Sequence, residues 1–318
     1  MKKKKAYVIG TKVDTSLSPA IFEHWFKKYD VDAEYGFIEI KEENFDKEIK
    51  PILKEDGLVG LNITMPFKEK ITPYLTSVES AQHTRNTSTK DKIILQGFGR
   101  DTDVRQHHIE ELNKIIKLPV NCISINGDEI IGKNTDCYGF ENACYSRIDR
   151  EDFKLSRRRL AIVLGYGGVA KAIIYSLVYM GCDYVMVFNR TFDKIKNLKH
   201  TFKGNDHFSS SCYLEPHKIE ELPKKIKGNE LIVNTTPVNI LNNSIKWNTA
   251  PNCVGLDVVY KPREGTGFLN HFEPSNRIEG IQMLVYQAAP CFKLWFGVEP
   301  EIDEQLFDVL YKKMDENK

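Results

Sequence analysis

The chain has 318 residues, of which 41% are apolar and 28% are charged, a composition typical of globular proteins. Because a single hydrophobic core seldom organises so long a chain, we expect two domains. Lysine and arginine together (45) exceed aspartate and glutamate (44) by one, and the run Lys2–Lys5 is typical of a solvated terminus. This balance argues against a polyanionic partner, and we expect no nucleic acid to bind.

The cysteines number seven and include no C-x-x-C pair. This usage favours reduced thiols over a disulfide framework or a zinc site, so we expect no metal. The apolar run near the start breaks at Gly10, too early for the core of a signal peptide, and nowhere do about eighteen apolar residues run together. We therefore expect a cytoplasmic protein without a membrane segment.

The amino-terminal part alternates strand-like and helix-like segments. Residues 6–10 (AYVIG) and 33–40 (AEYGFIEI) favour strands, whereas 19–29 (PAIFEHWFKKY) place their apolar side chains on one helical face. Ser18 before Pro19 is typical of a helix start, because its hydroxyl can cap free N–H groups. This order predicts a βαβ unit.

A hairpin and a second alternating unit follow along the chain. Residues 122–132 (CISINGDEIIG) predict the hairpin, with Asn126-Gly127 supplying the positive φ angles of a tight turn. Residues 158–191 contain a strand, a glycine turn, a helix and a second strand in that order, which is typical of a Rossmann-like domain. Further strands are expected at 231–237 and 253–260, and two helices at 281–297 and 301–313.

The glycine turn carries a dinucleotide-binding pattern. Gly165, Gly167 and Ala170 satisfy G-x-G-x-x-G/A directly after an apolar strand and at the head of a helix. There the bare backbone can approach a pyrophosphate, and the helix dipole favours its charge. A plain glycine turn between a strand and a helix is the alternative.

The end of the next strand bears on the choice of cofactor. An NAD binder normally ends this strand with an acid on the ribose hydroxyls, but this chain has Asn189 and Arg190 there. A guanidinium pairs well with a 2′-phosphate, and Lys194 adds positive charge, so NADP is preferred. Alternatively, Arg190 is a surface residue at a helix start.

The stretch NITMPFKEK, residues 62–70, combines a strand end with polar groups. Asn62 and Thr64 alternate with apolar residues, so both point to one side of the predicted strand. Pro66 can start a helix directly afterwards, which would carry Lys68 close to those polar groups.

Several blocks of this chain occur in the order seen in the shikimate dehydrogenase family, which the chain therefore resembles over most of its length. The most specific are N-x-T-x-P-x-K and N-T-D-x-x-G-F; the full set is TSLSP, NITMPFK, VNCISINGDEIIGKNTDCYGF, GYGGVAKA, NRTFDK, VNTTP, DVVYKP and QMLVYQAAPCFKLWFG. The resemblance implies an α/β fold of two α/β domains with the active site in a cleft between them. The substrate-binding domain would comprise residues 1–135 plus 282–318, with an insertion at about 83–116, and a Rossmann-like NADP-binding domain would comprise residues 136–281.

The resemblance also implies a catalytic pair, Lys68 and Asp136. A ketone that receives a hydride becomes an alkoxide that needs a proton, and a lysine ammonium can donate it. Asp136 would hold that ammonium in place. Without the surrounding blocks, Lys68 would be a solvated surface lysine and Asp136 a helix cap.

The family's other site residues carry over to this chain one by one. For the substrate they imply Ser16, Ser18, Asn62, Thr64, Asn121, Tyr260 and Gln287. For the cofactor they imply Gly165, Gly167, Gly168, Val169, Ala170, Asn189, Arg190, Thr191, Lys194, Thr235, Thr236, Pro237, Val258 and Gly280. Asn86 also resembles one family block, but Asn121 has the hairpin and N-T-D following it at the expected separation. Ser18 could instead cap a helix, and Tyr260 could belong to the core.

The chain departs from the family pattern at a few positions around the substrate blocks. The differing residues are Lys12, Thr15, Phe22, Glu23 and Cys122. The resemblance implies NADP-dependent, reversible reduction of 3-dehydroshikimate to shikimate in aromatic biosynthesis, by a monomer or homodimer. Quinate as substrate, NAD as cofactor, or a catalytically silent nucleotide sensor are the alternatives.

The insertion at about 83–116 is largely polar, and its end, near residues 104–116, favours a short amphipathic helix. Because insertions on a surface add little to the entropy of loop closure, the fold can accommodate it. We expect it to pack at the rim of the substrate domain and to supply no catalytic group.

Overall fold

The fold comes from a computed structural model. The structure describes residues 3–79, 102–148, 160–202, 211–222, 226, 228, 230–238, 252–262 and 265–316, with the backbone alone for 102–107. The chain forms two compact α/β units. The first comprises Met1–Arg85, Pro119–Gly139 and Leu284–Lys318, and the second Asn86–Leu118 and Phe140–Met283.

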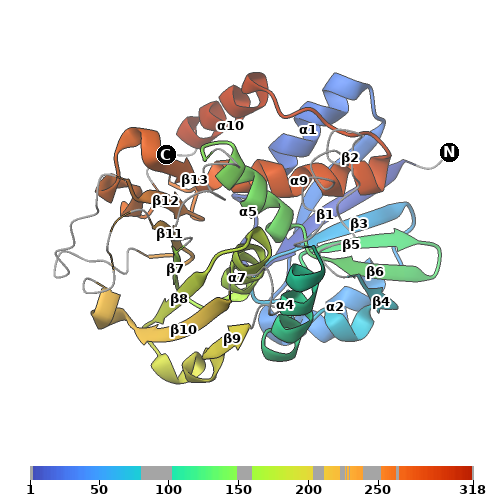
Figure 1. The fold of residues 1–318 in the computed structure, drawn as a ribbon. Coiled ribbons are helices and arrows are strands. Elements are labelled where there is room, and N and C mark those ends of the chain that lie inside the picture. The colour runs from blue at the N-terminus through green and yellow to red at the C-terminus, as the bar shows by residue number, and fades with distance from the viewer. Residues whose placement is uncertain are drawn as a thin grey trace. The chain divides into compact units, whose positions relative to one another are not determined.

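The first unit contains a mixed six-stranded sheet with the order β2-β1-β3-β5-β6-β4 (Figure 1). Its strands are β1 Lys4–Gly10, β2 Ala33–Glu39, β3 Leu58–Ile63, β4 Ser77–Val78, β5 Cys122–Asn126 and β6 Glu129–Lys133. Its helices are α1 Ser18–Tyr29, η1 Glu42–Asn44, α2 Phe45–Ile52, η2 Thr72–Tyr74 and α10 Glu304–Glu316. α5 Asp136–Tyr145 and α9 Gly280–Phe296 begin in one unit and end in the other. β1 is parallel to β2 and β3, as the predicted βαβ unit requires, whereas β5 is antiparallel to β3 and β6.

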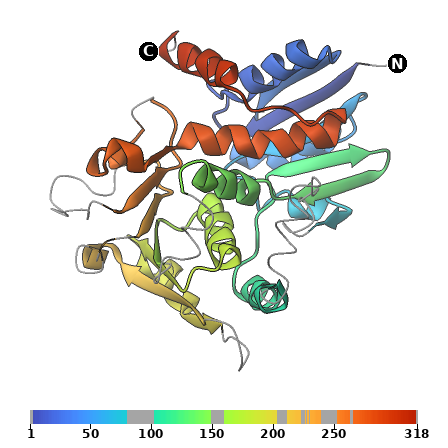
Figure 2. The ribbon, with the colours of Figure 1, turned by 45° about the horizontal axis from the view of Figure 1, so that its top comes forward.

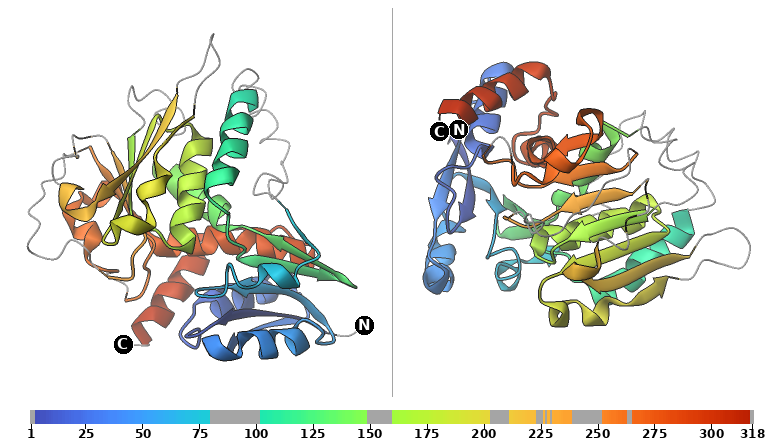
Figure 3. Two further views of the ribbon diagram at one scale, coloured as in Figure 1. Left: turned by 90° about the horizontal axis from the view of Figure 1, so that it is seen from below. Right: turned by 90° about the vertical axis from the view of Figure 1, so that its left-hand side faces the viewer.

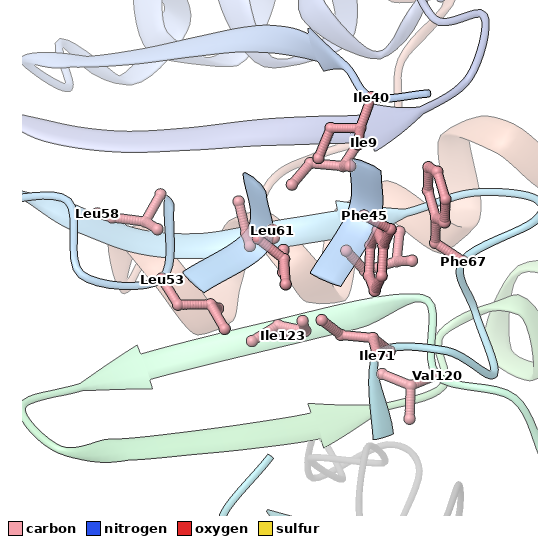
Figure 4. Packing of buried hydrophobic residues seen from close by; sticks show 12 residues of the cluster. Ile9, Ile40, Phe45, Leu53, Leu58, Leu61, Phe67, Ile71, Val120 and Ile123 are labelled. Atoms are coloured by element: carbon pink, nitrogen blue, oxygen red, sulfur yellow. The ribbon is translucent and has the colours of Figure 1, made fainter. Parts of the chain in front are cut away.

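Side chains on β3 alternate between two faces, as in any strand. Leu61 and Ile63 join a buried cluster with Phe45 of α2, on the face that Figure 4 shows. Gly60 and Asn62 face α9, since a Cβ on Gly60 would collide with the Trp295 indole. The alternation seen in NITMPFK thus separates an apolar face from a polar one.

Aromatic side chains pack α1 and α9 on this second face. Phe22 of α1 packs on both Tyr35 of β2, with ring centroids 3.9 Å apart, and Trp295 of α9, at 5.6 Å. The Trp295 indole N–H donates to the Ile123 carbonyl at 2.9 Å. α10 contacts α1, beside which it lies in Figure 2. These contacts fix α9 against the sheet.

The second unit contains a seven-stranded sheet with the order β13-β12-β11-β7-β8-β10-β9, parallel except for β9. Its strands are β7 Leu160–Leu164, β8 Tyr184–Asn189, β9 His200–Phe202, β10 Cys212–Lys218, β11 Leu231–Asn234, β12 Val254–Asp257 and β13 Arg277–Glu279. Its helices are α4 Thr102–Ile115, α7 Gly168–Met180, η4 Phe192–Lys194, η5 Lys196–Leu198, η6 Ile219–Glu221, η7 Phe268–His271 and η8 Pro274–Asn276. The predicted Rossmann-like order of strand, glycine turn, helix and strand is confirmed.

The location of the insertion differs from our expectation. We expected residues 83–116 at the rim of the substrate domain, but their described part, residues 102–116, belongs to the second unit. There α4 packs against α7, beside which it lies in Figure 3. The apolar side chains of Ile109, Leu112 and Ile116 are buried, so the amphipathic helix was predicted correctly and its partner was not.

Polar contacts also connect α4 to the edge of the second sheet. Glu111 lies 3.6 Å from the His200 imidazole of β9, and the His108 ring packs on Phe202 with centroids 5.7 Å apart. The earlier part of the insertion, residues 80–101, lies outside the described residues, as does Asn86 within it.

The helix that we expected to begin at Pro66 does not form in the described residues that follow it. Residues 65–71 form turns, the peptide bond before Pro66 is cis, and the 3₁₀ segment Thr72–Tyr74 follows. A helix does not form because the Lys68 carbonyl accepts the Val120 N–H, 3.1 Å away, rather than a helical donor.

Two further local details differ from the expectations. α1 begins at Ser18, but Leu17 occupies the N-cap position and no side chain caps the helix. The hairpin is confirmed, yet Asn126 pairs within the β5–β6 ladder, and the two loop residues are Gly127, with φ 60°, and Asp128. Glycine first in a two-residue loop is a favoured hairpin connection.

The cluster in Figure 4 leads to a test of stability. Phe45 is 1% exposed and stacks on Phe67 with ring centroids 4.3 Å apart. Phe45→Ala should lower the free energy of unfolding by about 3–5 kcal/mol, because it removes buried surface and leaves a cavity. Urea unfolding followed by the fluorescence of Trp25 and Trp295 measures this change. The control is Phe37→Ala on β2, where the ring is 49% exposed; equal losses in both variants would contradict the assigned core.

Candidate active site

Backbone hydrogen bonds fix the turn that carries Lys68. The Thr64 N–H donates to the Ile9 carbonyl at 2.9 Å, and the Phe67 N–H donates to the Thr64 carbonyl at 2.9 Å. The Phe67 ring is fully buried against Phe45. With one side of the turn held in the core, Lys68 has a defined place beside the polar end of β3.

Asp136 lies in the first turn of α5, just after the β6 strand. The Asn134 carboxamide holds this junction: its Nδ2 donates to the Pro119 carbonyl at 2.5 Å, and its Oδ1 accepts the Cys137 N–H at 3.1 Å. Asn134 therefore makes the capping contact with α5. This leaves both oxygens of Asp136 available for other partners.

Lys68 and Asp136 form a nearly buried ion pair. The Lys68 Nζ lies 2.5 Å from Asp136 Oδ2, with the two side chains 12% and 8% exposed. Asp136 Oδ1 accepts a hydrogen bond from Asn121 Nδ2 at 2.9 Å. Each carboxylate oxygen thus has a donor, which lowers the cost of burying the charges.

Asn121 connects this pair to α9. Its Oδ1 accepts the Thr135 N–H at 2.7 Å, which fixes the orientation of the amide. Its Nδ2 also approaches Thr135 Oγ1 at 3.0 Å and Gln287 Oε1 at 3.4 Å. Gln287 Nε2 in turn donates to the Leu284 carbonyl at 2.9 Å. Three segments distant in sequence therefore meet around Asp136.

Asn62 belongs to the same polar group. Its Oδ1 accepts the Tyr35 hydroxyl proton at 2.7 Å, and its Nδ2 donates to the Asn121 carbonyl and to Cys291 Sγ, both at 3.3 Å. Thr135 Oγ1 lies 3.6 Å from the same sulfur. We call Asn62, Lys68, Asn121, Thr135, Asp136, Gln287 and Cys291 the polar network.

Tyr35, Thr135 and Cys291 of this polar group were not predicted from the sequence. Two of them had detectable signals. Thr135 is part of the N-T-D block, and Cys291 follows Gln287 by four positions, so that Gln287 and Cys291 lie on one face of α9.

A hydrogen bond with Cys291, together with complete burial, raises the pKa of the Cys122 thiol. This thiol therefore stays protonated beneath the polar network.

The remaining expected hydroxyl groups of the first unit lie in the segments that follow β1 and β3. Ser16 Oγ accepts the Ser18 N–H at 3.2 Å, which links Ser16 to the first residue of α1. Thr64 Oγ1 donates to the Ile9 carbonyl at 3.1 Å. Tyr260, expected beside the substrate, belongs to the second unit, where its side chain is half-buried.

The glycine pattern in the second unit lies between β7 and α7, and its backbone fits a pyrophosphate. Gly165 has φ 100° and donates its N–H to the Phe188 carbonyl at 2.8 Å. A Cβ at Gly165 would lie 2.6 Å from Thr235 Oγ1, so only glycine allows this approach. α7 begins at Gly168, with Gly167 as its N-cap, and Val169 and Ala170 belong to its first turn. The free N–H groups of this first turn lie at the glycine loop.

Polar and cationic groups follow β8, where the adenosine end of a dinucleotide would bind. Asn189 Nδ2 donates to the Thr191 carbonyl at 2.9 Å, which shapes the turn after the strand. The side chains of Arg190, Thr191 and Lys194 are exposed. A guanidinium free to reach a phosphate fits NADP better than NAD.

The other expected cofactor residues follow β11 and β12, on the same edge of the sheet as the glycine loop. Thr235 donates its N–H to the Leu164 carbonyl at 2.9 Å, and Thr236 and Pro237 continue that turn. The Val258 N–H donates to the Asn234 carbonyl at 3.0 Å. A Cβ on Gly280 would lie 2.6 Å from the Val258 carbonyl, so these two segments touch through their backbones.

The described residues contain no group of three His, Cys, Asp or Glu side chains placed to hold a metal ion. No helix within the described ranges is both long and apolar enough to cross a membrane.

Three family models match this chain. Residues 8–86 match the shikimate dehydrogenase substrate binding domain, 148–245 match shikimate / quinate 5-dehydrogenase, and 280–304 match the shikimate 5′-dehydrogenase C-terminal domain. The first and third matches cover the segments that build the polar network, apart from residues 119–139. The second covers the glycine loop and β8.

Whole-chain relatives and a solved structure agree with these matches. The shikimate dehydrogenase (NADP(+)) of Caldicellulosiruptor bescii is 30% identical over 306 residues, covering 93% of this chain and 90% of that protein. Its counterpart in Caldicellulosiruptor saccharolyticus is 29% identical over 317 residues, covering 96% and 97%. The crystal structure of shikimate dehydrogenase from Aquifex aeolicus has 27% identity and a TM-score of 0.68, and covers 98% of this chain and 97% of its own. The chain therefore belongs to the shikimate dehydrogenase family.

Proposed function

We propose that this protein is an NADP-dependent shikimate dehydrogenase, which reversibly reduces 3-dehydroshikimate to shikimate. The observation that carries the proposal is the buried Lys68–Asp136 ion pair within the polar network. A lysine alone on a surface has no such partners, whereas a proton donor for a ketone needs a fixed position and a charged form. Family membership identifies the reaction that such a donor serves.

The reaction needs one hydride and one proton for each carbonyl reduced. When bound, NADPH supplies the hydride. Lys68 donates its Nζ proton to the carbonyl oxygen as charge develops there, and the product is a C–H and an O–H bond. Asp136, which accepts hydrogen bonds from Lys68 and Asn121, keeps the ammonium oriented. In the reverse direction the neutral lysine accepts the hydroxyl proton.

Substrate recognition is assigned to side chains of the first unit. Asn62, Asn121 and Gln287 supply amide donors and acceptors suited to ring hydroxyls, beside the catalytic pair. Ser16 and Ser18, with Thr64, supply hydroxyl donors for the carboxylate and ring. Tyr260, which belongs to the second unit, is proposed as one further contact. This set suits a small polyhydroxylated acid, and both shikimate and quinate belong to that class.

Cofactor binding is assigned to the carboxyl edge of the second sheet. The Gly165–Ala170 loop and the start of α7 would hold the pyrophosphate. Arg190 and Lys194, with Asn189 and Thr191, would hold the 2′-phosphate and its ribose. The segments Thr235–Pro237 and Val258, with Gly280, would contact the nicotinamide half.

A reducing compartment suits this chain. All seven cysteines are free thiols and all are buried. Free thiols persist where glutathione and thioredoxin keep them reduced. This supports the proposed cytoplasmic location.

The proposed proton donor leads to a kinetic test. Lys68→Ala should lower kcat by about 10²- to 10⁴-fold, the usual contribution of a positioned proton donor. Reduced-nicotinamide absorbance measures turnover with NADP and shikimate or quinate. The control is Lys70→Ala. Lys70 lies two residues after Lys68 in the same turn, and its exposed side chain pairs with Glu42. Near-normal turnover of Lys68→Ala, or an equal loss in both variants, would refute this mechanism.

Cofactor preference leads to a second test. Arg190→Ala should raise the KM for NADPH by about 10- to 100-fold, the range expected when a charged hydrogen bond is lost. The KM for NADH should change little, because NADH lacks the 2′-phosphate. Lys199→Ala, at another exposed cation of the unit, serves as control. Equal losses for both cofactors would show that Arg190 is structural.

A further inference from the structure

A completely buried carboxylate in the second unit has no part in the mechanism above. Asp257, at the carboxyl end of β12, is 0% exposed. Its Oδ1 accepts hydrogen bonds from Asn234 Nδ2 at 3.0 Å and from the Val259 N–H at 3.1 Å. Its Oδ2 accepts from the Thr266 N–H at 3.1 Å and from Thr266 Oγ1 at 2.7 Å. Four donors therefore surround one carboxylate.

Asn234 is the partner of Asp257 on the neighbouring strand. The two residues are paired in the parallel β11–β12 register, each at the last position of its strand. Asn234 is 1% exposed, and its Oδ1 accepts the Thr236 N–H at 3.2 Å and the Thr236 hydroxyl proton at 2.7 Å. Its Nδ2 also approaches Thr266 Oγ1 at 3.1 Å. Asn234 thus connects the turn after β11 to the segment after β12.

The same turn is attached to the glycine loop. Both the N–H and the hydroxyl of Thr235 donate to the Leu164 carbonyl, at 2.9 and 2.7 Å. Leu164 ends β7 and immediately precedes Gly165. A continuous set of hydrogen bonds therefore runs along the carboxyl edge, from the segment after β12 to the turn after β11 and on to the pyrophosphate loop.

We propose that Asp257, acting through Asn234, is a positioning residue that holds the two cofactor segments, the turn 235–237 and Val258, in their binding conformation. The inference rests on the cofactor role proposed above for these segments. Asp257 is inside the protein, and its partners are the Asn234 amide, the Val259 N–H, and the N–H and hydroxyl of Thr266. Its effect is to order them before NADPH arrives, which lowers the entropy lost on binding.

The carboxylate has properties that an amide cannot reproduce. All four partners of Asp257 are donors, and the carboxylate offers acceptors on both oxygens. An asparagine would replace one carboxylate oxygen by an NH₂ group. That group would face either the donors of Asn234 and Val259 or those of Thr266, and these buried donors would then have no acceptor. The chain also closes tightly here: Gly265 has φ 60°, and a Cβ on it would lie 3.0 Å from Asp257 Oδ2.

Asp257→Asn in the full-length protein tests the proposal. The Kd for NADPH, measured by fluorescence titration without substrate, should rise by at least about 10-fold, as expected when a hydrogen bond to a charged group is lost. The Kd for shikimate, measured without cofactor, should stay within about 2-fold of normal, which is below one ordinary hydrogen bond. In a uniformly destabilised protein, measured well below its unfolding temperature, the Kd for NADPH would not rise while the Kd for shikimate stayed the same.

Glu230→Gln provides a matched control. Glu230 is a second buried carboxylate of the same sheet, 1% exposed, but it precedes β11 at the amino end. It accepts hydrogen bonds from the Gly228 N–H at 2.7 Å and from Cys253 Sγ at 3.0 Å. Its replacement should leave the Kd for NADPH unchanged. An equal rise in both variants would show that any buried carboxylate supports binding through stability alone, which overturns the proposal.

Thr266→Val keeps the test decisive if Asp257→Asn does not fold. Valine keeps the shape of threonine and removes the hydroxyl, which donates to Asp257, accepts from Asn234 and also accepts the Phe268 N–H at 3.4 Å. The Kd for NADPH should rise about 3- to 10-fold, as for one ordinary hydrogen bond. An unchanged Kd in this folded variant would overturn the positioning role. Failure of the unmodified protein to bind NADPH would instead refute the proposed cofactor site.

Discussion

The structure of the first unit depends on one constraint, namely that a lysine and an aspartate share a nearly buried position. Removing two charges from water costs several kcal/mol per ion unless every lone pair and proton finds a partner. Asp136 meets this requirement with Lys68 on one oxygen and Asn121 on the other. Asn121 is held in turn by Thr135 and Gln287. The packing of α9 against β3 and β5 is thus as necessary to the ion pair as its two members.

The second unit uses a buried carboxylate differently. Asp257 has neutral donors around it where Asp136 has an ammonium, and it ties segments together instead of orienting a reacting group. Both carboxylates lie where a strand ends and the chain must turn, which is where backbone N–H groups lose their ladder partners. In parallel sheets the same edge receives ligands. The groups that complete the fold at this edge therefore also shape the proposed binding sites.

Much of this organisation was predictable from the sequence, and the failures have physical causes. Period-two alternation separated Asn62 from Ile63 correctly, because a strand allows no other choice. The helix expected after Pro66 failed because a long-range hydrogen bond from Val120 takes the Lys68 carbonyl, which no local pattern reveals. The amphipathic face of α4 was evident, but not that α7 would cover it. Tyr35 was missed because its partner Asn62 is 27 residues away, and Asp257 was missed because its pairing with Asn234 appears only when β11 and β12 lie side by side.

The central claim is that Lys68 and Asp136 act as one catalytic unit, and a double-mutant cycle tests it most directly. kcat/KM for shikimate oxidation with NADP would be measured in the unmodified protein, Lys68→Ala, Asp136→Asn and the double variant, each verified as folded by circular dichroism. Residues that act as a unit show strongly non-additive losses. The double variant should be about as slow as the slower single variant, since each change already disables the pair. Losses that multiply, as for two independent residues, would contradict it.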